Sequence, residues 1–221
     1  VASASHELRT PIAVICSAVS ASKSANEVQK DHFLHIIAEE SLRLSTLADD
    51  LLLLNRADTE RFELELEPVE LDTLLLNTYE AFEPLARQHH ISLQISLPEE
   101  PLPRCSCDSR RIQQALSILI SNSFSYGTPG GYTKLTLSYD KSMFWIMVED
   151  NGIGIEEKDK PFIFERFYRA DKSRSAKEHF GLGLCIAQEI ITAHGGKIAV
   201  TDTPGGGARF FILLRHPAAK S

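Results

Sequence analysis

The chain has 221 residues, of which 43% are hydrophobic and 24% charged, so it can bury the core of one large domain or two modest ones. Its 30 acidic residues outnumber its 23 basic residues, and the net charge of −7 gives no support to general nucleic-acid binding. The sequence contains no run approaching the roughly 18 apolar residues that span a membrane and no basic-then-apolar leader, so we expect this stretch to be soluble and cytoplasmic.

Residues 1–22 predict a helix with an apolar stripe of helical period. The stripe consists of Leu8, Ile12, Ile15 and Val19. A polar turn over residues 20–26 leads to a second helix, which runs to about Ala57. Its heptad seam consists of Leu34, Ile37, Ser41, Leu44, Ala48 and Leu51, widened by Leu47 and Leu54. Because neither helix can bury its apolar face alone, we expect an antiparallel hairpin that pairs with a second copy into a homodimeric four-helix bundle.

The composition changes after the second helix. Residues 62–67 alternate with period two until Pro68, which places a domain boundary near residues 58–67. We therefore expect a helical hairpin over 1–60, a linker over 61–67 and a second domain over 68–217. The predicted helices of that domain are 72–88, 109–125 and 183–194, and the predicted strands are 91–97, 103–107, 132–140, 143–150, 197–202 and 208–215. This mixture favours an α+β sandwich, with one mixed sheet and helices on one face.

Four cysteines are spread through apolar or strand-like surroundings: Cys16, Cys105, Cys107 and Cys185. We expect reduced thiols, because a chain of this size does not need a disulfide framework. Cys105 and Cys107 flank a serine in an alternating stretch, which places both thiols on one face of a strand. A metal site is not favoured there, since no second pair of cysteines or histidines lies nearby in sequence.

The first motif that carries chemistry is Ser5-His6-Glu7-Leu8-Arg9-Thr10-Pro11, on the first helix. At about 100° per residue, His6 lies opposite the apolar stripe, and Thr10 shares its face one turn later. Pro11 cannot donate to the carbonyl of Glu7, so the helix should bend or loosen beside the histidine. A solvent-facing imidazole beside a carboxylate is a plausible phosphoacceptor, whereas a lone histidine would more simply be an ordinary surface residue.

Two further motifs combine a polar side chain with a helix end or a turn. Asn122 lies late on an amphipathic helix, between Asp108 and Tyr126, and its amide oxygen could coordinate Mg²⁺. Asp150 ends an alternating strand and is followed by Asn151-Gly152-Ile153-Gly154, where two glycines would let a flat base approach the backbone. Alone, each pattern would more often be a polar surface residue or an ordinary turn.

The last two motifs suit phosphate groups. Phe164-Glu165-Arg166-Phe167-Tyr168-Arg169 opens a stretch, residues 166–180, that carries five basic side chains against two acidic ones. Such a segment suits a lid over a triphosphate with Arg169 reaching phosphate, although most of its charges fit a solvated loop equally well. Gly181-Leu182-Gly183-Leu184 opens the helix 183–194, where backbone N–H groups and the helix dipole favour phosphate oxygens.

In this order and spacing the motifs resemble those of the sensor histidine kinases of two-component signalling, over nearly the whole chain. The resemblance implies a HisKA-type dimerisation and phosphoacceptor hairpin. It also implies an ATP-binding domain with the GHKL (Bergerat) fold of the Hsp90, MutL and gyrase-like ATPases. The implied activity is that of an enzyme, which phosphorylates His6 with ATP and Mg²⁺ and passes the phosphoryl group to an aspartate of a response regulator.

The resemblance assigns roles to individual residues. Glu7 would be the general base for His6, and Glu7 with Thr10 matches a Glu-x-x-Thr pattern that supports dephosphorylation of the regulator. Asp150 would accept a hydrogen bond from the adenine amino group, and Asn122 would hold the metal. The implied catalytic residues are His6, Glu7, Thr10 and Arg169. The implied nucleotide-binding residues are Asn122, Tyr126, Asp150, Gly152, Gly154, Arg169, Gly181, Leu182, Gly183 and Leu184.

The implied partners are a second copy of the chain and the receiver domain of a response regulator, with no nucleic acid. We expect the full-length protein to be anchored in a bacterial cell membrane through an upstream sensor region, with this part in the cytoplasm.

Four positions depart from the family's pattern: Ile118, Ser125, His179 and Ala208. Relatives usually carry asparagine, lysine, glycine and a small hydroxyl residue there, in that order. We therefore expect an active but slow kinase. The alternative is a degenerate nucleotide-binding dimer module that acts as a scaffold or mainly as a phosphatase. A gyrase-like or chaperone ATPase is a weaker third hypothesis, because it leaves the His6 motif unexplained.

Overall fold

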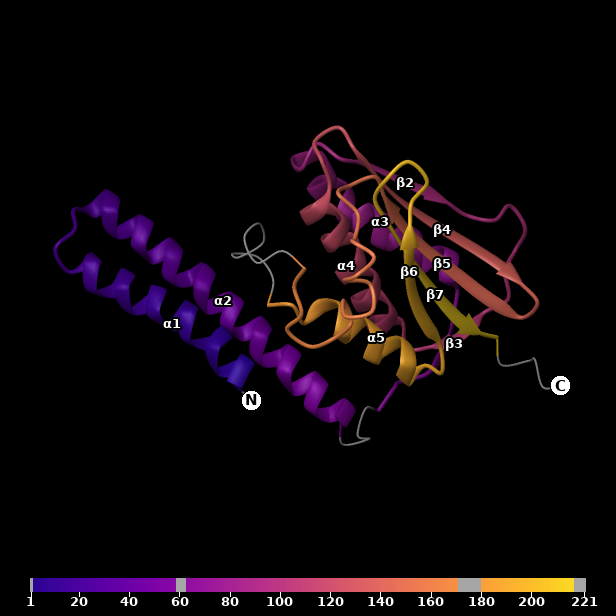
Figure 1. The fold of residues 1–221 in the computed structure, drawn as a ribbon, viewed down its shortest axis with the longest axis horizontal. Helices are drawn as coiled ribbons and strands as arrows, with labels where there is room; N and C mark the ends of the chain where they lie inside the picture. The colour runs from indigo at the N-terminus through magenta and orange to yellow at the C-terminus, as the bar shows by residue number, and fades with distance from the viewer. Residues whose placement is uncertain (1, 59–62, 171–179, 217–221) are drawn as a thin grey trace. The chain divides into compact units, whose positions relative to one another are not determined.

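The computed structural model describes residues 2–58, 63–170 and 180–216, apart from the side chains of residues 2–6 and 58 (Figure 1). It consists of two compact units, Val1–Arg61 and Phe62–Ser221. Within the described ranges, every helix is too short or too polar to cross a lipid bilayer.

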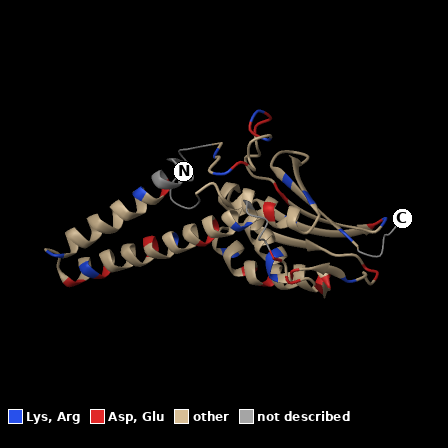
Figure 2. Cartoon of the chain, turned by 90° about the horizontal axis from the view of Figure 1, so that it is seen from below, with Lys and Arg blue, Asp and Glu red and all other residues tan. Residues whose placement is uncertain are grey.

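The first unit is the predicted helical hairpin, formed by α1, Ala2–Ser22, and α2, Glu27–Asp58. Asn26 organises the turn between them. Its side-chain Oδ1 accepts the N–H of Gln29 at 3.0 Å, and the Gln29 side chain accepts the N–H of Asn26 at 3.1 Å. This reciprocal cap satisfies two N–H groups at the start of α2. Side chains of both charge signs occur along α2, whereas the charged residues of α1, Glu7 and Arg9, lie near its start (Figure 2).

The buried faces of the hairpin differ from the predicted seam. Pro11 and Ala18, seven residues apart on α1, are buried, whereas Ile12 and Val19 of the predicted stripe are 49% and 44% exposed. The buried apolar residues of α2 are Leu47, Leu53 and Leu54, and the exposed residues of its predicted seam are Leu34, Ser41 and Ala48. A helix that packs against two neighbours carries two adjoining apolar strips. Periodicity alone cannot tell which strip faces the hairpin partner.

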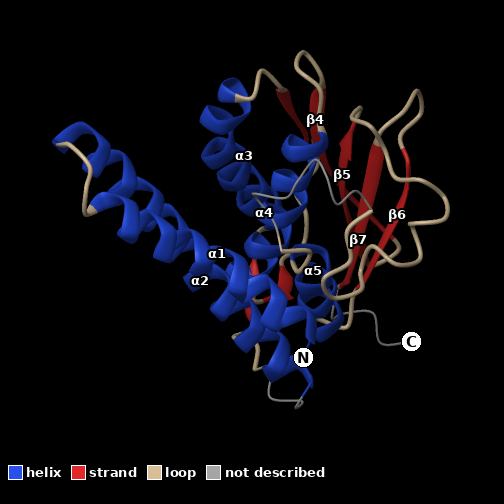
Figure 3. Cartoon of the chain, turned by 60° about the vertical axis from the view of Figure 1, so that its left-hand side comes forward, coloured by secondary structure: helices blue, strands red, loops and turns tan. Residues whose placement is uncertain are grey.

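The second unit contains a five-stranded sheet in the order β2-β4-β5-β7-β6, with β2 parallel to β4 and the other neighbours antiparallel. Its strands are β2 Ser92–Ser96, β4 Tyr132–Asp140, β5 Met143–Asp150, β6 Lys197–Asp202 and β7 Ala208–Arg215. Three helices cover one face of this sheet (Figure 3): α3 Leu71–Gln88, α4 Ser109–Tyr126 and α5 Gly183–Ala193. The predicted α+β sandwich is confirmed, with bounds that agree to within a few residues.

The core of this unit lies between the helices and the sheet face that they cover. The strand register aligns Leu135, Val148 and Phe210 across β4, β5 and β7, and all three are buried. Leu116 of α4 and Ile190 of α5 are fully buried in the helical layer. Burying each such side chain stabilises the fold by about 1.5–3 kcal/mol. This core therefore fixes where the ends of β5, α4 and α5 lie.

A separate two-stranded sheet corrects two predictions. β3, Cys105–Cys107, does not join the main sheet but pairs antiparallel with β1, Glu67–Val69. Pro68, at which the alternating stretch 62–67 was predicted to end, lies in the middle of β1, opposite Ser106. Proline is tolerated there because an edge strand leaves N–H groups outside the ladder. The single-sheet prediction was wrong because the pattern of a short strand does not specify its partner strand.

The cysteines are free thiols. Cys105 and Cys107 are buried on the same face of β3, with Ser106 exposed between them, as the alternation predicts. Cys185 is buried in α5, and Cys16 is exposed on α1. Across the part of the chain that the structure describes, histidine, cysteine and acidic side chains form no group of three that could hold a metal ion.

Candidate active site

Asp150 is a buried acidic side chain of the second unit that backbone N–H groups hold in place. It is the last residue of β5, is buried, and lies on the face of the sheet that the helices cover. Its Oδ1 accepts two backbone N–H groups, from Gly152 at 2.9 Å and from Ala208 at 3.1 Å. Burial raises the pKa of Asp150, the two N–H bonds partly oppose that rise, and the neighbouring Glu149 adds to it. Both of these donors meet Oδ1, and neither of them meets Oδ2.

Two glycines allow the backbone to close around this carboxylate. A Cβ on Gly207 would collide with the carbonyl oxygen of Asp150 and would lie 2.7 Å from the Cα of Asn151. A Cβ on Gly152 would collide with the carbonyl oxygen of Tyr126, at the end of α4. Only residues without a side chain fit at these two close approaches.

Thr203 holds the loop of residues 205–207, which precedes Ala208, the second N–H donor to Asp150. This residue is 3% exposed, and its hydroxyl donates to the carbonyl oxygen of Ala208 at 3.0 Å. Its N–H donates to the carbonyl oxygen of Gly207 at 3.1 Å, and its own carbonyl accepts the N–H of Gly206 at 2.9 Å. Thr203 therefore fixes the peptide group whose N–H contacts Asp150.

The C-terminal end of α4 brings Asn122 and Tyr126 to the same region. The carbonyl of Tyr126 accepts the N–H of Ile153 at 3.3 Å, which ties the helix end to the turn that follows Asp150. Asn122 lies one turn earlier and is half-buried. At the other end of α4, the side chain of Asp108 accepts the N–H of Arg111 at 3.1 Å as an N-cap.

The start of α5 adjoins α4 as well. Gly183 is the first residue of α5, and a Cβ on it would lie 3.1 Å from Cγ2 of Ile118 on α4. The carbonyl of Gly181 accepts the N–H of Phe167 at 2.9 Å, which joins the glycine turn to the segment 164–169. The structure thus brings three of the predicted nucleotide motifs together: the Asp150 turn, the Asn122 helix and the turn 181–184. Ile118, one of the four departures, serves here as a packing residue against Gly183.

The predicted lid lies largely outside the described residues, which stop at Ala170 and resume at Phe180. Lys172, Arg174, Lys177 and His179 fall in that gap. Arg169 is half-buried, and its contact with phosphate stays a prediction. Before it, Tyr168 donates a hydrogen bond to Asp159 at 2.7 Å.

The predicted phosphoacceptor turn lies within α1. His6 belongs to this helix, and its side chain falls outside the described ones. Glu7 is half-buried, Thr10 is exposed, and the helix continues through Pro11, which is buried. The face of α1 that His6 occupies and its interaction with Glu7 stay predictions.

Sequence reasoning missed two supports of the site. One is Thr203, for which the three following glycines were the only signal. The other is His194, which belongs to none of the motifs of the sequence. Its Nε2 accepts the N–H of Asp108 at 3.0 Å, and its Nδ1 lies 2.7 Å from the carbonyl oxygen of Ile190. His194 thereby joins the end of α5 to the start of α4, at the ends of these helices away from Asn122 and Gly183.

Comparisons with known proteins agree with this geometry. Residues 107–218 match the family of histidine kinase-, DNA gyrase B- and HSP90-like ATPases, which defines the class of the second unit. Residues 1–60 match the His Kinase A (phospho-acceptor) domain. The chain therefore belongs to the histidine kinases and comprises the phosphoacceptor and ATP-binding parts of a two-component sensor kinase.

Among curated relatives, the chain is 34% identical over 222 residues to the sensor histidine kinase WalK of Bacillus subtilis. The matched region covers 98% of this chain and 36% of WalK. It is 36% identical over 215 residues to the alginate biosynthesis sensor protein KinB of Pseudomonas aeruginosa, and this match covers 96% of the chain and 36% of KinB. The chain thus spans little more than a third of these relatives.

Solved structures of histidine kinases share the fold. The structure of Acinetobacter baumannii histidine kinase AdeS has a TM-score of 0.76 and 25% identity, covering 96% of this chain and 98% of that one. Histidine kinase ThkA, solved in complex with the response regulator protein TrrA, has a TM-score of 0.76 and 25% identity. The match covers 98% of this chain and 61% of the ThkA chain.

Proposed function

We propose that this chain is an ATP-dependent protein-histidine kinase that phosphorylates its own His6 and transfers the phosphoryl group to an aspartate of a response regulator. The observation that carries the proposal is the buried Asp150 carboxylate, whose Oδ1 is held by two backbone N–H groups, one just after β5 and one at the start of β7. Such a fixed acceptor suits recognition of the edge of a flat, amino-bearing base.

Adenine would bind with its amino group donating to Oδ2 of Asp150. The close backbone approaches at Gly152 and Gly207 hold in place the turn and the loop whose N–H groups donate to this carboxylate. Because Oδ1 is already occupied by N–H donors, the carboxylate is oriented before the ligand arrives. A base with a carbonyl oxygen in place of the amino group would face a carboxylate oxygen and be rejected.

The triphosphate would extend toward Asn122 and the start of α5. Mg²⁺ prefers oxygen ligands and usually keeps several waters and phosphate oxygens, so one half-buried amide oxygen from Asn122 fits such a site. Bound Mg²⁺ would neutralise phosphate charge during transfer. The N–H groups at the start of α5, from Gly183 onward, would meet phosphate oxygens, and Arg169 would add a positive charge.

In the transfer step, a ring nitrogen of His6 would attack the γ-phosphorus of ATP. The new P–N bond forms as the bond to the β–γ bridging oxygen breaks, and ADP leaves with that electron pair. Glu7 would take the proton of the attacking imidazole. The phosphoryl group would then pass to a carboxylate oxygen of the regulator. As the P–N bond breaks, its electron pair returns to the imidazole, which takes back the proton held by Glu7 and is neutral histidine again. Thr10 would position water for the later hydrolysis of that acyl phosphate.

We further propose that the hairpin works as a homodimer. Ile12, Val19 and Leu34 are 49%, 44% and 60% exposed in the single chain. Pairing with a second hairpin would bury this second apolar strip in a four-helix bundle. The relatives are nearly three times as long as this chain, and we propose that a membrane-anchored sensor region accompanies it in the full-length protein.

A degenerate scaffold or phosphatase is the second candidate, and the departures from the family's pattern motivate it. Two of them are compatible with nucleotide binding. Ala208 supports Asp150 through its backbone N–H, which needs no side-chain hydroxyl. Ile118 packs against Gly183, so an apolar residue suits its position. These contacts favour the kinase.

Incubation with γ-labelled ATP and Mg²⁺ tests the proposal. We expect acid-labile, base-stable label in the wild type and none in His6→Gln, and we expect the label to pass to a response regulator. Label that persists in His6→Gln would rule out His6 as the phosphoacceptor. A protein that binds ATP and never becomes labelled would instead be the degenerate module.

A further inference from the structure

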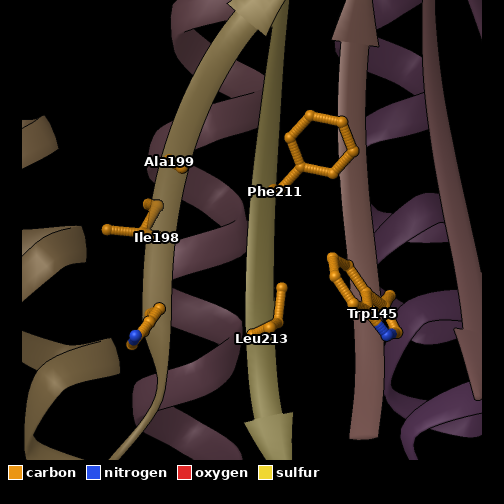
Figure 4. Close-up of a pocket in the computed structure, with 6 residues that line it drawn as sticks. Trp145, Ile198, Ala199, Phe211 and Leu213 are labelled. Carbon is orange, nitrogen blue, oxygen red and sulfur yellow. The ribbon is translucent and has the colours of Figure 1, made fainter. Parts of the chain in front are cut away.

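The outer face of the five-stranded sheet, opposite α3–α5, carries an apolar patch that the kinase reaction does not use. The outer sheet patch consists of Trp145 and Met147 on β5, Phe211 and Leu213 on β7, and Ala199 on β6. The register pairs Trp145 with Leu213 and Met147 with Phe211, and Phe211 in turn with Ala199, so the five side chains adjoin. Figure 4 shows Trp145, Phe211, Leu213 and Ala199 on three neighbouring strands.

The patch is open and hollowed. Trp145 is 39% exposed and Ala199 is exposed, while the other three residues are half-buried. A hollow of about 280 Å³ lies between Trp145, Phe211, Leu213, Ala199 and Lys197. It exists because the small side chain of Ala199 leaves room beside two large ones. A contiguous exposed apolar surface with a polar rim is typical of an interaction site.

The rim of the patch is basic, although the whole chain is acidic. Its basic residues are Lys134, Lys197, Arg209 and Arg215, and its acidic residues are Asp140 and Glu149. Glu149 is neutralised by Arg209, with 2.6 Å between the charged groups. The remaining rim is positive in a chain whose net charge is −7. A partner with acidic flanks therefore complements it.

We propose that the outer sheet patch binds an amphipathic helix whose apolar side is flanked by acidic residues, supplied by a partner domain. A helix suits the surface because three helices already pack on the other face of the same sheet (Figure 3). An apolar side chain of that helix would enter the hollow beside Ala199 while its acidic flanks meet Lys197 and Arg215. This inference is independent of the kinase reaction.

Two other occupants fit less well. A second copy docked through this face would place one basic rim against another, which opposes pairing. A lipid surface offers no protruding side chain for the hollow, so it would leave that space unfilled.

Trp145 is the only tryptophan of the chain, so its fluorescence reports directly on the patch. The test titrates the whole chain with a synthetic helical peptide that carries leucine at positions i, i+3, i+4 and i+7 and glutamate on both flanks. A matched peptide with lysine in place of glutamate and vesicles of phosphatidylserine and phosphatidylcholine are the other arms. We expect a blue shift with the acidic peptide and at least about tenfold weaker binding of the basic one.

A charge reversal sharpens the test. Lys197→Glu should weaken the acidic peptide by about tenfold and strengthen the basic one. Arg87→Glu is the matched control, since it makes the same charge change at an exposed residue of α3, on the opposite side of the sheet, and should leave binding unchanged. Unshifted Trp145 emission with the acidic peptide overturns the proposal, and so does an equal response to both peptides. A response to vesicles alone would assign the patch to membranes, and a concentration-dependent shift of the protein by itself would assign it to a second copy.

Discussion

The two units of this kinase build their sites in opposite ways. In the hairpin, His6, Glu7 and Thr10 lie within one turn and a half of a single helix, so their spacing follows from helical geometry. In the ATP-binding unit, Asp150, Asn122 and Gly183 come from three elements, and the site exists only because backbone contacts join those elements. We infer that changes in the helical turn that contains His6, Glu7 and Thr10 should alter the phosphoryl transfer alone. Changes in the backbone contacts that hold the Asp150 carboxylate should alter nucleotide binding.

The largest effect is expected at Gly207. Gly207→Ala would drive a Cβ into the carbonyl oxygen of Asp150, so the loop must shift and the Ala208 N–H must leave the carboxylate. We expect ATP affinity to fall by about 100-fold or more, measured by calorimetry.

Gly205→Ala is the matched control for this prediction. Gly205 also has a positive φ, of 92°, but an added Cβ there meets nothing within 4 Å. Gly205→Ala should lower the stability of the protein by about 1 kcal/mol and leave its ATP affinity nearly unchanged. Equal loss of binding in both variants would mean that backbone strain, and not the approach to Asp150, is responsible.

The next prediction distinguishes the roles of two residues on α1, Glu7 and Thr10. Glu7→Ala should slow autophosphorylation by about 100-fold, because the attacking imidazole loses its proton acceptor. Thr10→Ala should leave that rate unchanged and slow dephosphorylation of the phospho-regulator. Both rates should be measured on both variants with the cognate regulator. If Thr10→Ala abolished autophosphorylation as well, Thr10 would instead be a support for the helix at Pro11.

A smaller effect is expected from Thr203, which acts on Asp150 through the Ala208 peptide. Thr203→Val keeps the side-chain shape but loses the hydroxyl that donates to Ala208. We expect ATP affinity to fall by about tenfold, corresponding to one lost buried hydrogen bond. Inorganic triphosphate, which makes no contact with Asp150, should bind both proteins alike.

Thr203→Ser retains the hydroxyl and should bind ATP like the wild type. A uniform loss of ATP and triphosphate in Thr203→Val would show that the threonine supports the fold in general and has no particular role in orienting Asp150.

The smallest effect concerns stability of the hairpin. Burial, with the neighbouring charge of Asp49, raises the pKa of Asp50 to about 6. Because the folded state holds this proton more tightly than the unfolded state, stability falls as pH rises from about 4 to about 6. After allowance for solvent screening, Asp50→Asn should stabilise the protein by about 1 kcal/mol above pH 6 and by nothing below pH 4.

Thermal unfolding at pH 4 and pH 7.5 measures this difference. Asp49→Asn is the control, since it removes only the neighbouring charge and should give a smaller gain in the same direction. An Asp50→Asn gain of equal size at both pH values would contradict the linkage.

The sequence predicted most elements of the fold, and the turns and helix ends that meet near Asp150, for a physical reason. The helical and strand periods are local, and the glycines at positions 152, 181 and 183 mark turns that need little other context. What it did not predict depends on contacts between distant segments. Pairing of β3 with β1, the strip of α1 that carries Ala18, and the hydrogen bond of Thr203 to Ala208 are all set by tertiary packing.

The division of labour between the units is tested most directly by the ATP dissociation constants of the wild type, His6→Gln and Asp150→Asn, measured by calorimetry at neutral pH. The Asp150 carboxylate is held by backbone N–H groups of its own unit, so His6→Gln should bind ATP as the wild type does. Asp150→Asn replaces an acceptor oxygen with an amide that can face the adenine amino group, and it should bind ATP at least about tenfold more weakly. Unchanged affinity in Asp150→Asn, or lost affinity in His6→Gln, would contradict the account.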